Sequence, residues 1–290
     1  MNIYIVIPAH NEEAHIKASL DSLVQQTLLP KKLVVVDDNS TDSTAAIVKK
    51  YCSEYHWISL VSTVSSDLHL PGAKIINAFY KGFNQLDQNF DVICKYDADL
   101  IFPKNYLKKL AAYYHMDSKT GMVAGHCYIK KNKAWVLENI TNTDHIRGGL
   151  KSYRKACFED IGGLKRSMGW DTLDELLALY YKWNFKTDLG LRVKHLKPTG
   201  NNYSPSSKYL QGEALYKMRF GLLLALLSAL KLAHKKNKPI LLKLYMKGYL
   251  NSWLARHPFL ITKEQGHFIR KHRWKKLKNK LISPLLRPSN

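Results

Sequence analysis

Residues 34–44 read "VVVDDNSTDST", where an apolar run passes directly into two acids and a polar turn. A short run of β-branched residues is typical of a strand that is buried on both faces. One of residues 41–43 could simply cap the helix that follows the turn. Capping does not explain Asp37 and Asp38, which come directly after the strand. A carboxylate at this strand end could accept a hydrogen bond from a base N–H or a ribose hydroxyl.

Similar short apolar runs recur through the first half of the chain and predict strands at 3–7, 33–36, 58–61, 92–96 and 121–129. Between them, apolar residues repeat at helical spacing in three groups: Ile16, Leu20, Leu23 and Val24; Ile76, Phe79, Tyr80 and Phe83; Leu107, Leu110, Ala111 and Tyr114. This alternation predicts an α/β fold with a mostly parallel sheet and flanking helices. Ligands bind at the carboxyl ends of the strands in such sheets, so polar motifs that follow strands should meet there.

A second polar motif, "PAHNEE" at residues 8–13, follows the first predicted strand. Pro8 ends the strand, and Asn11 and Glu12 open a helix. Glu12 could favour the positive end of that helix dipole, or it could reach a ribose hydroxyl.

A third motif, "CKYDADLIFP" at residues 94–103, places Asp97 and Asp99 on either side of Ala98. Residues i and i+2 at a strand end point the same way, so both carboxylates can face one point beyond the sheet. Two converging carboxylates repel each other unless a cation lies between them, and hard oxygen ligands suit Mg²⁺ or Mn²⁺. The chain has 15 aspartates, so a solvated turn that arose by chance is the alternative.

The order and spacing of these motifs resemble family 2 glycosyltransferases, which have the Rossmann-like GT-A fold. The resemblance covers about residues 1–200 and includes a helix motif, here "PGAKIINAFYKGF" at 71–83, before the Asp-x-Asp. It implies Asp99 as a metal ligand. It also implies a nucleotide-sugar pocket formed by Pro8, Ala9, Asn11, Glu12, Asp38, Lys74, Asn77 and Asp97.

The segment "GGLKRSMGWDTLDELLALYYKWNF" at 162–185 looks like the acceptor side of the same family, where an acidic pair supplies the general base. Here Trp170 precedes Asp171, and Asp174 and Glu175 follow. The motif position favours Asp171, and Asp174 at i+3 is the alternative, while one of the two could cap the helix. Trp170 is either a core residue or an aromatic platform that binds the acceptor sugar.

His195 lies in "LRVKHLKPTG", after an apolar strand. A single histidine in such a place is often structural. The family resemblance implies instead that it completes the metal site, and imidazole is an acceptable ligand for the divalent ion.

The chain carries a formal net charge of +22, which points to an anionic partner. From Lys231 to the end there are 16 Lys and Arg residues and one acid. We therefore expect a catalytic domain at 1–212 and a basic amphipathic helical tail at 213–290. The apolar stretch at 220–233 is short of the ~20 residues that span a bilayer, which predicts interfacial or packed helices. A helical subdomain with a solvated basic face and a nucleic-acid-binding tail are the alternatives.

Other function classes lose support because their motifs are absent. The sequence contains no GxGxxG, no GxxxxGK[ST] and no HExxH. Its four cysteines are scattered and suggest neither disulfides nor a zinc site. The apolar run at the N-terminus is too short for a signal peptide, which favours a reduced, cytosolic-side protein.

These observations and the resemblance together predict an inverting, metal-dependent glycosyltransferase with Mg²⁺ or Mn²⁺ as cofactor. It would move a hexose-type sugar from a nucleotide-sugar, here a UDP-sugar, to a glycan or a lipid-linked glycan in cell-surface polysaccharide synthesis. It would be peripheral on the cytoplasmic face of the membrane, held by an anionic lipid surface, with no nucleic acid as partner. Transfer to polyprenyl phosphate is one alternative. A basic nucleic-acid-binding or nucleotidyl-transfer protein is the alternative from another class.

Overall fold

The structure is a computed structural model that describes residues 1–64, 72–138, 144–197 and 207–282. The chain divides into two compact units. The first unit comprises Met1–Arg166 and Trp170–Asn201, and the second unit comprises Ser167–Gly169 and Asn202–Asn290.

A single mixed sheet forms the centre of the first unit. Its strands are β1 (Ile3–Ala9), β2 (Lys32–Asp38), β3 (Ile58–Thr63), β4 (Val92–Tyr96), β5 (Leu100–Ile101), β6 (Thr120–Lys131), β7 (Ala134–Leu137), β8 (Leu150–Arg154) and β9 (Asn184–His195). Among the described residues the strand order is β3-β2-β1-β4-β8-β6-β9-β5, with β7 paired to β6. Strands β1 to β4 run parallel to one another, and β6 runs parallel to β9, whereas β5, β7 and β8 are antiparallel to their neighbours.

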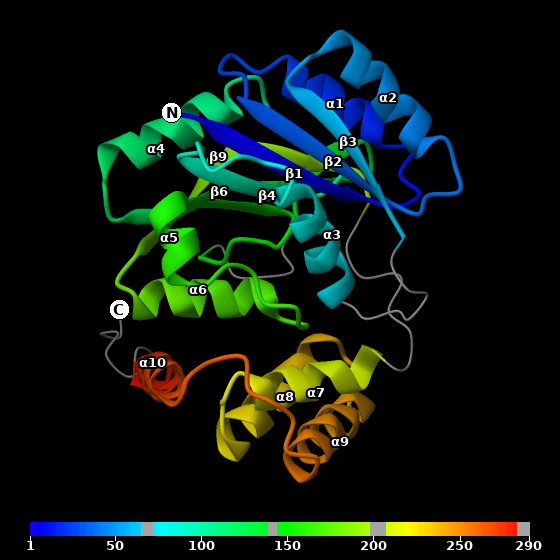
Figure 1. The fold of residues 1–290 in the computed structure, drawn as a ribbon. Coiled ribbons are helices and arrows are strands. Elements are labelled where there is room, and N and C mark those ends of the chain that lie inside the picture. The colour runs from blue at the N-terminus through cyan, green and yellow to red at the C-terminus, as the bar shows by residue number, and fades with distance from the viewer. Residues whose placement is uncertain (65–71, 139–143, 198–206, 283–290) are drawn as a thin grey trace. The chain divides into compact units, whose positions relative to one another are not determined.

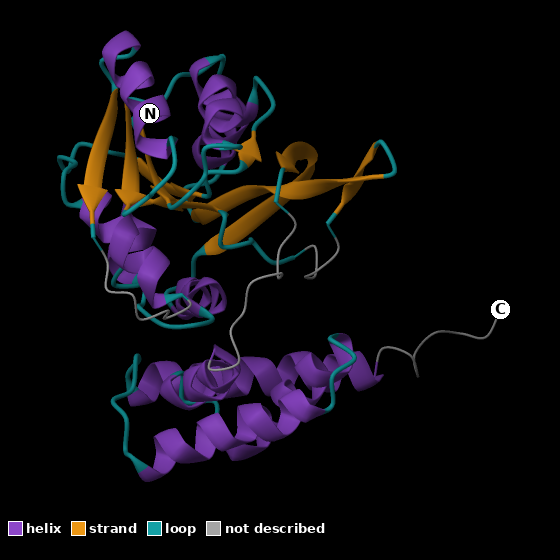
Figure 2. Ribbon diagram, turned by 90° about the vertical axis from the view of Figure 1, so that its right-hand side faces the viewer, coloured by secondary structure: helices purple, strands orange, loops and turns teal. Residues whose placement is uncertain are grey.

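Helices cover both faces of this sheet. They are α1 (Ile16–Val24), α2 (Thr44–Glu54), α3 (Ala73–Phe83), α4 (Tyr106–Met116), α5 (Lys155–Asp160) and α6 (Trp170–Tyr180). In Figure 1, α1, α2 and α4 lie above the sheet, and α3, α5 and α6 lie below it. Figure 2 shows the same layering from the side. The predicted α/β fold with flanking helices is therefore confirmed, and the antiparallel strands qualify its description as mostly parallel.

The strand register brings the polar motifs to one edge. Ala9, at the end of β1, pairs with Asp37 near the end of β2. Tyr96, at the end of β4, pairs with Leu150 at the start of β8. Pro8 lies one residue before Ala9 in the same strand. Because β1, β2 and β4 are neighbouring parallel strands, the residues that follow them share one end of the sheet.

The second unit is helical, with α7 (Ser207–Lys217), α8 (Leu222–Lys235), α9 (Ile240–Leu254) and α10 (Lys263–Ile282). Helices α7 and α9 cross so closely that a Cβ on Gly212 would lie 1.7 Å from the Tyr245 carbonyl oxygen. Glycine at this position allows the close approach. Ala229, Ala233, Leu241 and Tyr245 form a small core between α8 and α9. The boundary predicted between 212 and 213 falls inside α7. Within the described ranges, no helix is both long and apolar enough to cross a membrane.

Candidate active site

The loops after β1 and β2 are tied to each other by hydrogen bonds. The Asn11 backbone N–H donates to Ser40 Oγ (2.9 Å), and Asn11 Oδ1 accepts from the Thr41 backbone N–H (2.8 Å). The Glu12 backbone N–H donates to the hydroxyl of Thr44, the first residue of α2 (2.8 Å). Asn11 adopts a φ of 53°, in the left-handed region that Asn tolerates better than most residues. The first two polar motifs therefore build one wall at the sheet edge.

Asp38 and Lys74 lie together at this wall. Asp38 is buried at the end of β2, and Lys74 Nζ, from the first turn of α3, lies 3.9 Å from Asp38 Oδ2. His10 Nδ1 lies 2.6 Å from the Asp38 carbonyl oxygen. Asn77 is one turn further along α3, and its Oδ1 accepts a hydrogen bond from Arg166 Nε (2.7 Å). The structure thus groups Asp38 with Lys74, whereas the amide of Asn77 pairs with an arginine.

Glu12 is near the Asp-x-Asp motif in space. Its Oε1 accepts a hydrogen bond from Lys197 Nζ (2.7 Å), and its Oε2 is buried without a hydrogen-bond partner among the described residues. Burial raises the pKa of the Glu12 carboxyl, Lys197 opposes this shift, and the negative charge of Asp99 adds to it. This unsatisfied oxygen, whose carboxyl senses the charge of Asp99, suits a site that receives a further group.

Asp97 is held by a buried lysine. Lys95, the next-to-last residue of β4, is buried and pairs with Asp97 Oδ1. Burial alone would raise the pKa of Asp97, but the ammonium of Lys95 outweighs it and lowers the pKa. A Cβ on Gly149 would lie 2.4 Å from Asp97 Oδ2, so only glycine leaves room for this carboxylate. The positions of Lys95 and Gly149 therefore fix an ionised Asp97 at the strand end.

Asp99 begins a chain of charged side chains. His195, the last residue of β9, places Nε2 3.3 Å from Asp99 Oδ2 and Nδ1 2.7 Å from Glu138 Oε2. Arg147 pairs with the same Glu138 oxygen. Burial would lower the pKa of His195, but its hydrogen bonds to Asp99 and Glu138 raise it to about 9. Glu138 thus orients the imidazole, and Nε2 faces the Asp-x-Asp motif.

The residues around Asp99 fit a divalent cation. With its Nε2 deprotonated, His195 would offer a nitrogen donor 3.3 Å from an oxygen of Asp99, and Mg²⁺ or Mn²⁺ accepts such a pair. Among the described residues, Cys127, Glu138 and His195 also bring ligand atoms within 4.8 Å of one another. Arg147 already neutralises Glu138, and burial raises the pKa of Cys127 to about 12. We therefore regard Glu138 as the group that orients His195, as is usual for metal-binding histidines, rather than as a ligand.

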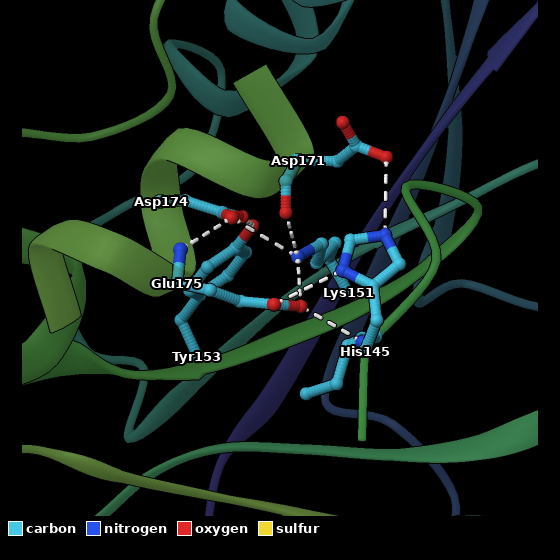
Figure 3. A network of polar contacts seen from close by, with 7 residues as sticks. His145, Lys151, Tyr153, Asp171, Asp174 and Glu175 are labelled. Carbon is cyan, nitrogen blue, oxygen red and sulfur yellow. Dashed lines mark hydrogen bonds and ion pairs between the residues drawn. The ribbon is translucent and has the colours of Figure 1, made fainter. Parts of the chain in front are cut away.

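The acidic residues predicted for the acceptor side belong to a buried network centred on Lys151 (Figure 3). Lys151, in the antiparallel strand β8, donates from Nζ to the Asp171 carbonyl oxygen (2.6 Å), Asp174 Oδ1 (3.0 Å) and Glu175 Oε1 (3.1 Å). Tyr153, two residues along β8, donates its hydroxyl to Asp174 Oδ2. Both oxygens of Asp174 therefore accept hydrogen bonds from residues of β8, and these bonds connect the first turns of α6 to that strand.

Asp171 and Asp174 lie in different environments. The Asp171 side chain is 31% exposed and that of Asp174 is 2% exposed. Burial raises the pKa of Asp174 to about 7. Burial would also raise the pKa of Asp171, but a hydrogen bond from His145 and the charge of Lys151 lower it. Asp171 is thus ionised and accessible, whereas Asp174 is enclosed.

His145 connects the two acids that flank Asp174 in sequence and space. Its Nδ1 lies 3.0 Å from Glu175 Oε2, and its Nε2 lies 3.6 Å from Asp171 Oδ2. Trp170 is buried beside this network, with Lys95 Nζ 5.6 Å from the centre of its ring. The buried indole therefore contacts the lysine that pairs with Asp97, and its burial agrees with the interpretation of Trp170 as a core residue.

Several residues of the site were not predicted from the sequence: Lys95, Glu138, His145, Arg147, Lys151, Tyr153 and Lys197. Of these, only Lys95, in "VICKYDAD", could have been predicted from the sequence. A charged residue inside an apolar strand needs a buried partner of opposite charge. The others take their meaning from partners that are distant in sequence, which a single sequence does not reveal.

Comparison with known sequences identifies relatives of this chain. The family described as Glycosyl transferase family 2 matches residues 4–162. The chain is 33% identical over 215 residues to the probable glycosyltransferase YdaM of Bacillus subtilis, which covers 67% of this chain and 47% of YdaM. It is 26% identical over 184 residues to the O-antigen chain rhamnosyltransferase RfbN of Salmonella typhimurium, which covers 56% of this chain and 55% of RfbN. The chain spans about half the length of these curated relatives.

Solved structures share the fold at low sequence identity. Residues 1–349 of S. aureus TarS, in complex with UDP-GlcNAc, match with a TM-score of 0.57 and 22% identity, over 78% of this chain and 66% of that chain. The mannosyltransferase PcManGT from Pyrobaculum calidifontis, in complex with GDP-Man and Mn²⁺, matches with a TM-score of 0.57 and 14% identity, over 95% of this chain and 80% of that chain. These matches agree with the predicted GT-A architecture.

Proposed function

The chain belongs to glycosyl transferase family 2, and we propose that it moves a hexose-type sugar from a nucleotide-sugar to a hydroxyl group with inversion. The observation that carries this proposal is the convergence of three strand-end motifs and one accessible carboxylate, Asp171. We infer a UDP-sugar as donor, in keeping with the UDP-GlcNAc bound to TarS. We infer a glycan or lipid-linked glycan of the cell surface as acceptor, in keeping with the O-antigen enzyme among the relatives.

The donor would lie along the edge formed by β1, β2 and β4. Pro8, Ala9, Asn11 and Asp38 would border the nucleoside, since they lie at the ends of β1 and β2. Lys74 is a cation 3.9 Å from Asp38, at the first turn of α3, where it can meet a diphosphate oxygen. Glu12, Asn77 and Asp97 would complete this pocket, with Asp97 held in its ionised form by Lys95.

Asp99 and His195 would hold a Mg²⁺ or Mn²⁺ ion, and the Mn²⁺ in the PcManGT structure is in keeping with this. When bound, the ion would offset the negative charge that develops on the departing diphosphate. Glu138 and Arg147 keep the His195 ring in place, and Glu12 Oε2 has no hydrogen-bond partner among the described residues.

Asp171 would act as the general base. As the acceptor oxygen bonds to the anomeric carbon, its proton passes to Asp171, and the bond between that carbon and the diphosphate oxygen breaks with its electron pair. One displacement of this kind inverts the anomeric centre. Asp174 does not fit this role, because Lys151 and Tyr153 occupy its two oxygens. A base also favours a hydroxyl acceptor over polyprenyl phosphate, whose oxygen is already ionised.

The test is product analysis with a set of nucleotide-sugars and Mn²⁺. Wild-type protein should release UDP and transfer the sugar to an added glycan acceptor. Asp171→Asn should slow transfer by about 10²–10⁴-fold with unchanged donor affinity. Asp174→Asn should keep its rate at temperatures below its unfolding midpoint. Release of pyrophosphate, or wild-type turnover by Asp171→Asn, would overturn the proposal.

A further inference from the structure

The second unit exposes large apolar side chains on two neighbouring helices. On α8 they are Leu222, Leu223, Leu227 and Leu230, and on α9 they are Ile240, Leu250, Trp253 and Leu254. Leu254 is 71% exposed and Trp253 is 59% exposed. Leu223, Leu227 and Leu230 are spaced by four and three residues, so they share one face of α8. That face lies away from the small core that α8 makes with α9.

The exposed face of α9 mixes apolar and basic residues. It consists of Ile240, Lys243, Lys247, Leu250 and Leu254, all exposed. Their spacing of three, four, three and four residues places them in one row along the helix. Lysine can lay its aliphatic stem along an apolar surface and extend its ammonium group to a phosphate or to water. This row therefore suits a boundary between a hydrocarbon layer and anionic head groups.

The charge of the chain is concentrated in the second unit. Residues 202–290 hold 19 of the 45 Lys and Arg residues but two of the 23 acids, and none of these two is an aspartate. Two copies of such a unit repel each other, which disfavours self-association through these faces. A nucleic acid would pair with the lysines but would leave the leucines and Trp253 in water.

We propose that the exposed row of α9 docks on the surface of an anionic lipid bilayer, with this helix in the plane of the interface. Helix α9 has 15 residues, so it is about 23 Å long and shorter than the ~30 Å hydrocarbon core. The core that α9 shares with α8 includes Leu241 and Tyr245, which lie on the opposite side of α9 from the exposed row, so the row itself can face a lipid surface. This inference depends on the proposed function in one respect: a lipid-linked acceptor would lie at the same membrane surface.

The test is co-sedimentation of the full chain with vesicles, without donor or acceptor. Wild-type protein should bind phosphatidylcholine vesicles that contain phosphatidylglycerol, should bind pure phosphatidylcholine much more weakly, and should be released by salt. Leu250→Glu with Leu254→Glu should reduce partitioning at least tenfold. Lys243→Gln with Lys247→Gln should reduce it by about fivefold per lysine.

A matched control is available in the first unit, where Leu29 is 50% and Leu189 is 52% exposed. Leu29→Glu with Leu189→Glu should bind vesicles as the wild type does. Because misfolding of the α9 variant would mimic a loss of binding, quenching by brominated lipid gives a second measurement. Wild-type fluorescence should be quenched more than that of Trp253→Phe.

Three outcomes would overturn the docking proposal: no binding to anionic vesicles, unchanged binding by the α9 leucine variant, or equal quenching of wild type and Trp253→Phe. A wild-type dimer that the leucine variant converts to monomer would assign the row to a second copy instead. Asp171→Asn should bind vesicles normally while losing transfer, so failure of the enzymatic proposal and failure of docking are distinguishable.

Discussion

Replacing His145 with glutamine should remove a defined part of the pH dependence of stability. His145 lies between Glu175 and Asp171, with its Nδ1 3.0 Å from one carboxylate and its Nε2 3.6 Å from the other. Burial would lower the pKa of His145, but its hydrogen bonds to Asp171 and Glu175 raise it from 6.5 to about 9. Glutamine keeps a polar side chain of similar length and cannot carry the charge.

The size and sign follow from the two pKa values. A histidine whose pKa is higher in the folded state stabilises the fold fully below the unfolded value of 6.5. This contribution is lost as the pH rises through about 9. The difference between 6.5 and about 9 corresponds to about 3 kcal/mol of free energy of unfolding. Wild-type protein should therefore lose about 3 kcal/mol more than His145→Gln across this window.

Urea unfolding of the two proteins at a pH below 6.5 and at a pH above 9 measures this difference. His195 has a pKa raised to about 9 and titrates in the same window, but both proteins contain it, so its effect cancels. The raised pKa of Asp174 reduces stability as the pH rises from 3.8 to about 7, which lies mostly below the window. His115→Gln, at an exposed position of α4, is the matched control.

A second readout tests the same contact through activity. Removing the imidazolium should raise the pKa of Asp171, because the hydrogen bond from His145 helps to keep it low. The acidic limb of the pH–rate profile should therefore move to higher pH in His145→Gln. Equal pH dependence of unfolding in wild type and His145→Gln, with an unmoved acidic limb, would refute the ion pairs on which this reasoning depends.

Three further predictions concern the remainder of the site. Asp99→Ala should abolish the increase in melting temperature that Mn²⁺ produces, as measured by scanning fluorimetry, and a shift equal to that of wild type would remove Asp99 as a ligand. Gly149→Ala places a Cβ 2.4 Å from Asp97 Oδ2, so it should cost about 1–3 kcal/mol in urea unfolding and should weaken donor binding measured by calorimetry. Lys151→Met leaves Asp174 without its cation and should cost about 3–5 kcal/mol in urea unfolding, and a cost under about 1 kcal/mol would contradict the buried network.

The strands with continuous apolar runs were predictable from the sequence. The run predicted at 33–36 lies within β2 (Lys32–Asp38), and the run at 92–96 coincides with β4. Parallel strands in the middle of a sheet are buried on both faces, so their own residues must be apolar and the pattern is local. The acids that follow these strands were predictable for the same reason, because each interrupts the apolar pattern where the strand ends.

Strand β8 was not predictable, because its sequence "LKSYR" has no apolar run. Lys151 and Ser152 are nonetheless fully buried in it. The burial of Lys151 is stabilised by Asp174 and Glu175 on α6, more than twenty positions away in the chain. A lysine in a sequence normally predicts a solvent-exposed position. Only the fold shows that Asp174 and Glu175 neutralise the buried ammonium of Lys151.

The choice between Asp171 and Asp174 shows why access must be considered before basicity. Asp174 has the pKa of about 7 that suits a general base, whereas the pKa of Asp171 is below its ordinary value. However, burial raises the pKa of Asp174, and the same burial leaves its oxygens bonded to Lys151 and Tyr153, out of reach of an acceptor hydroxyl. Proton transfer requires hydrogen-bond contact, so we propose the weaker but accessible Asp171 as the general base. On this proposal the buried network positions the base. Lys151 donates to the Asp171 carbonyl oxygen, and His145 lies beside the Asp171 carboxylate, so both hold Asp171 in place.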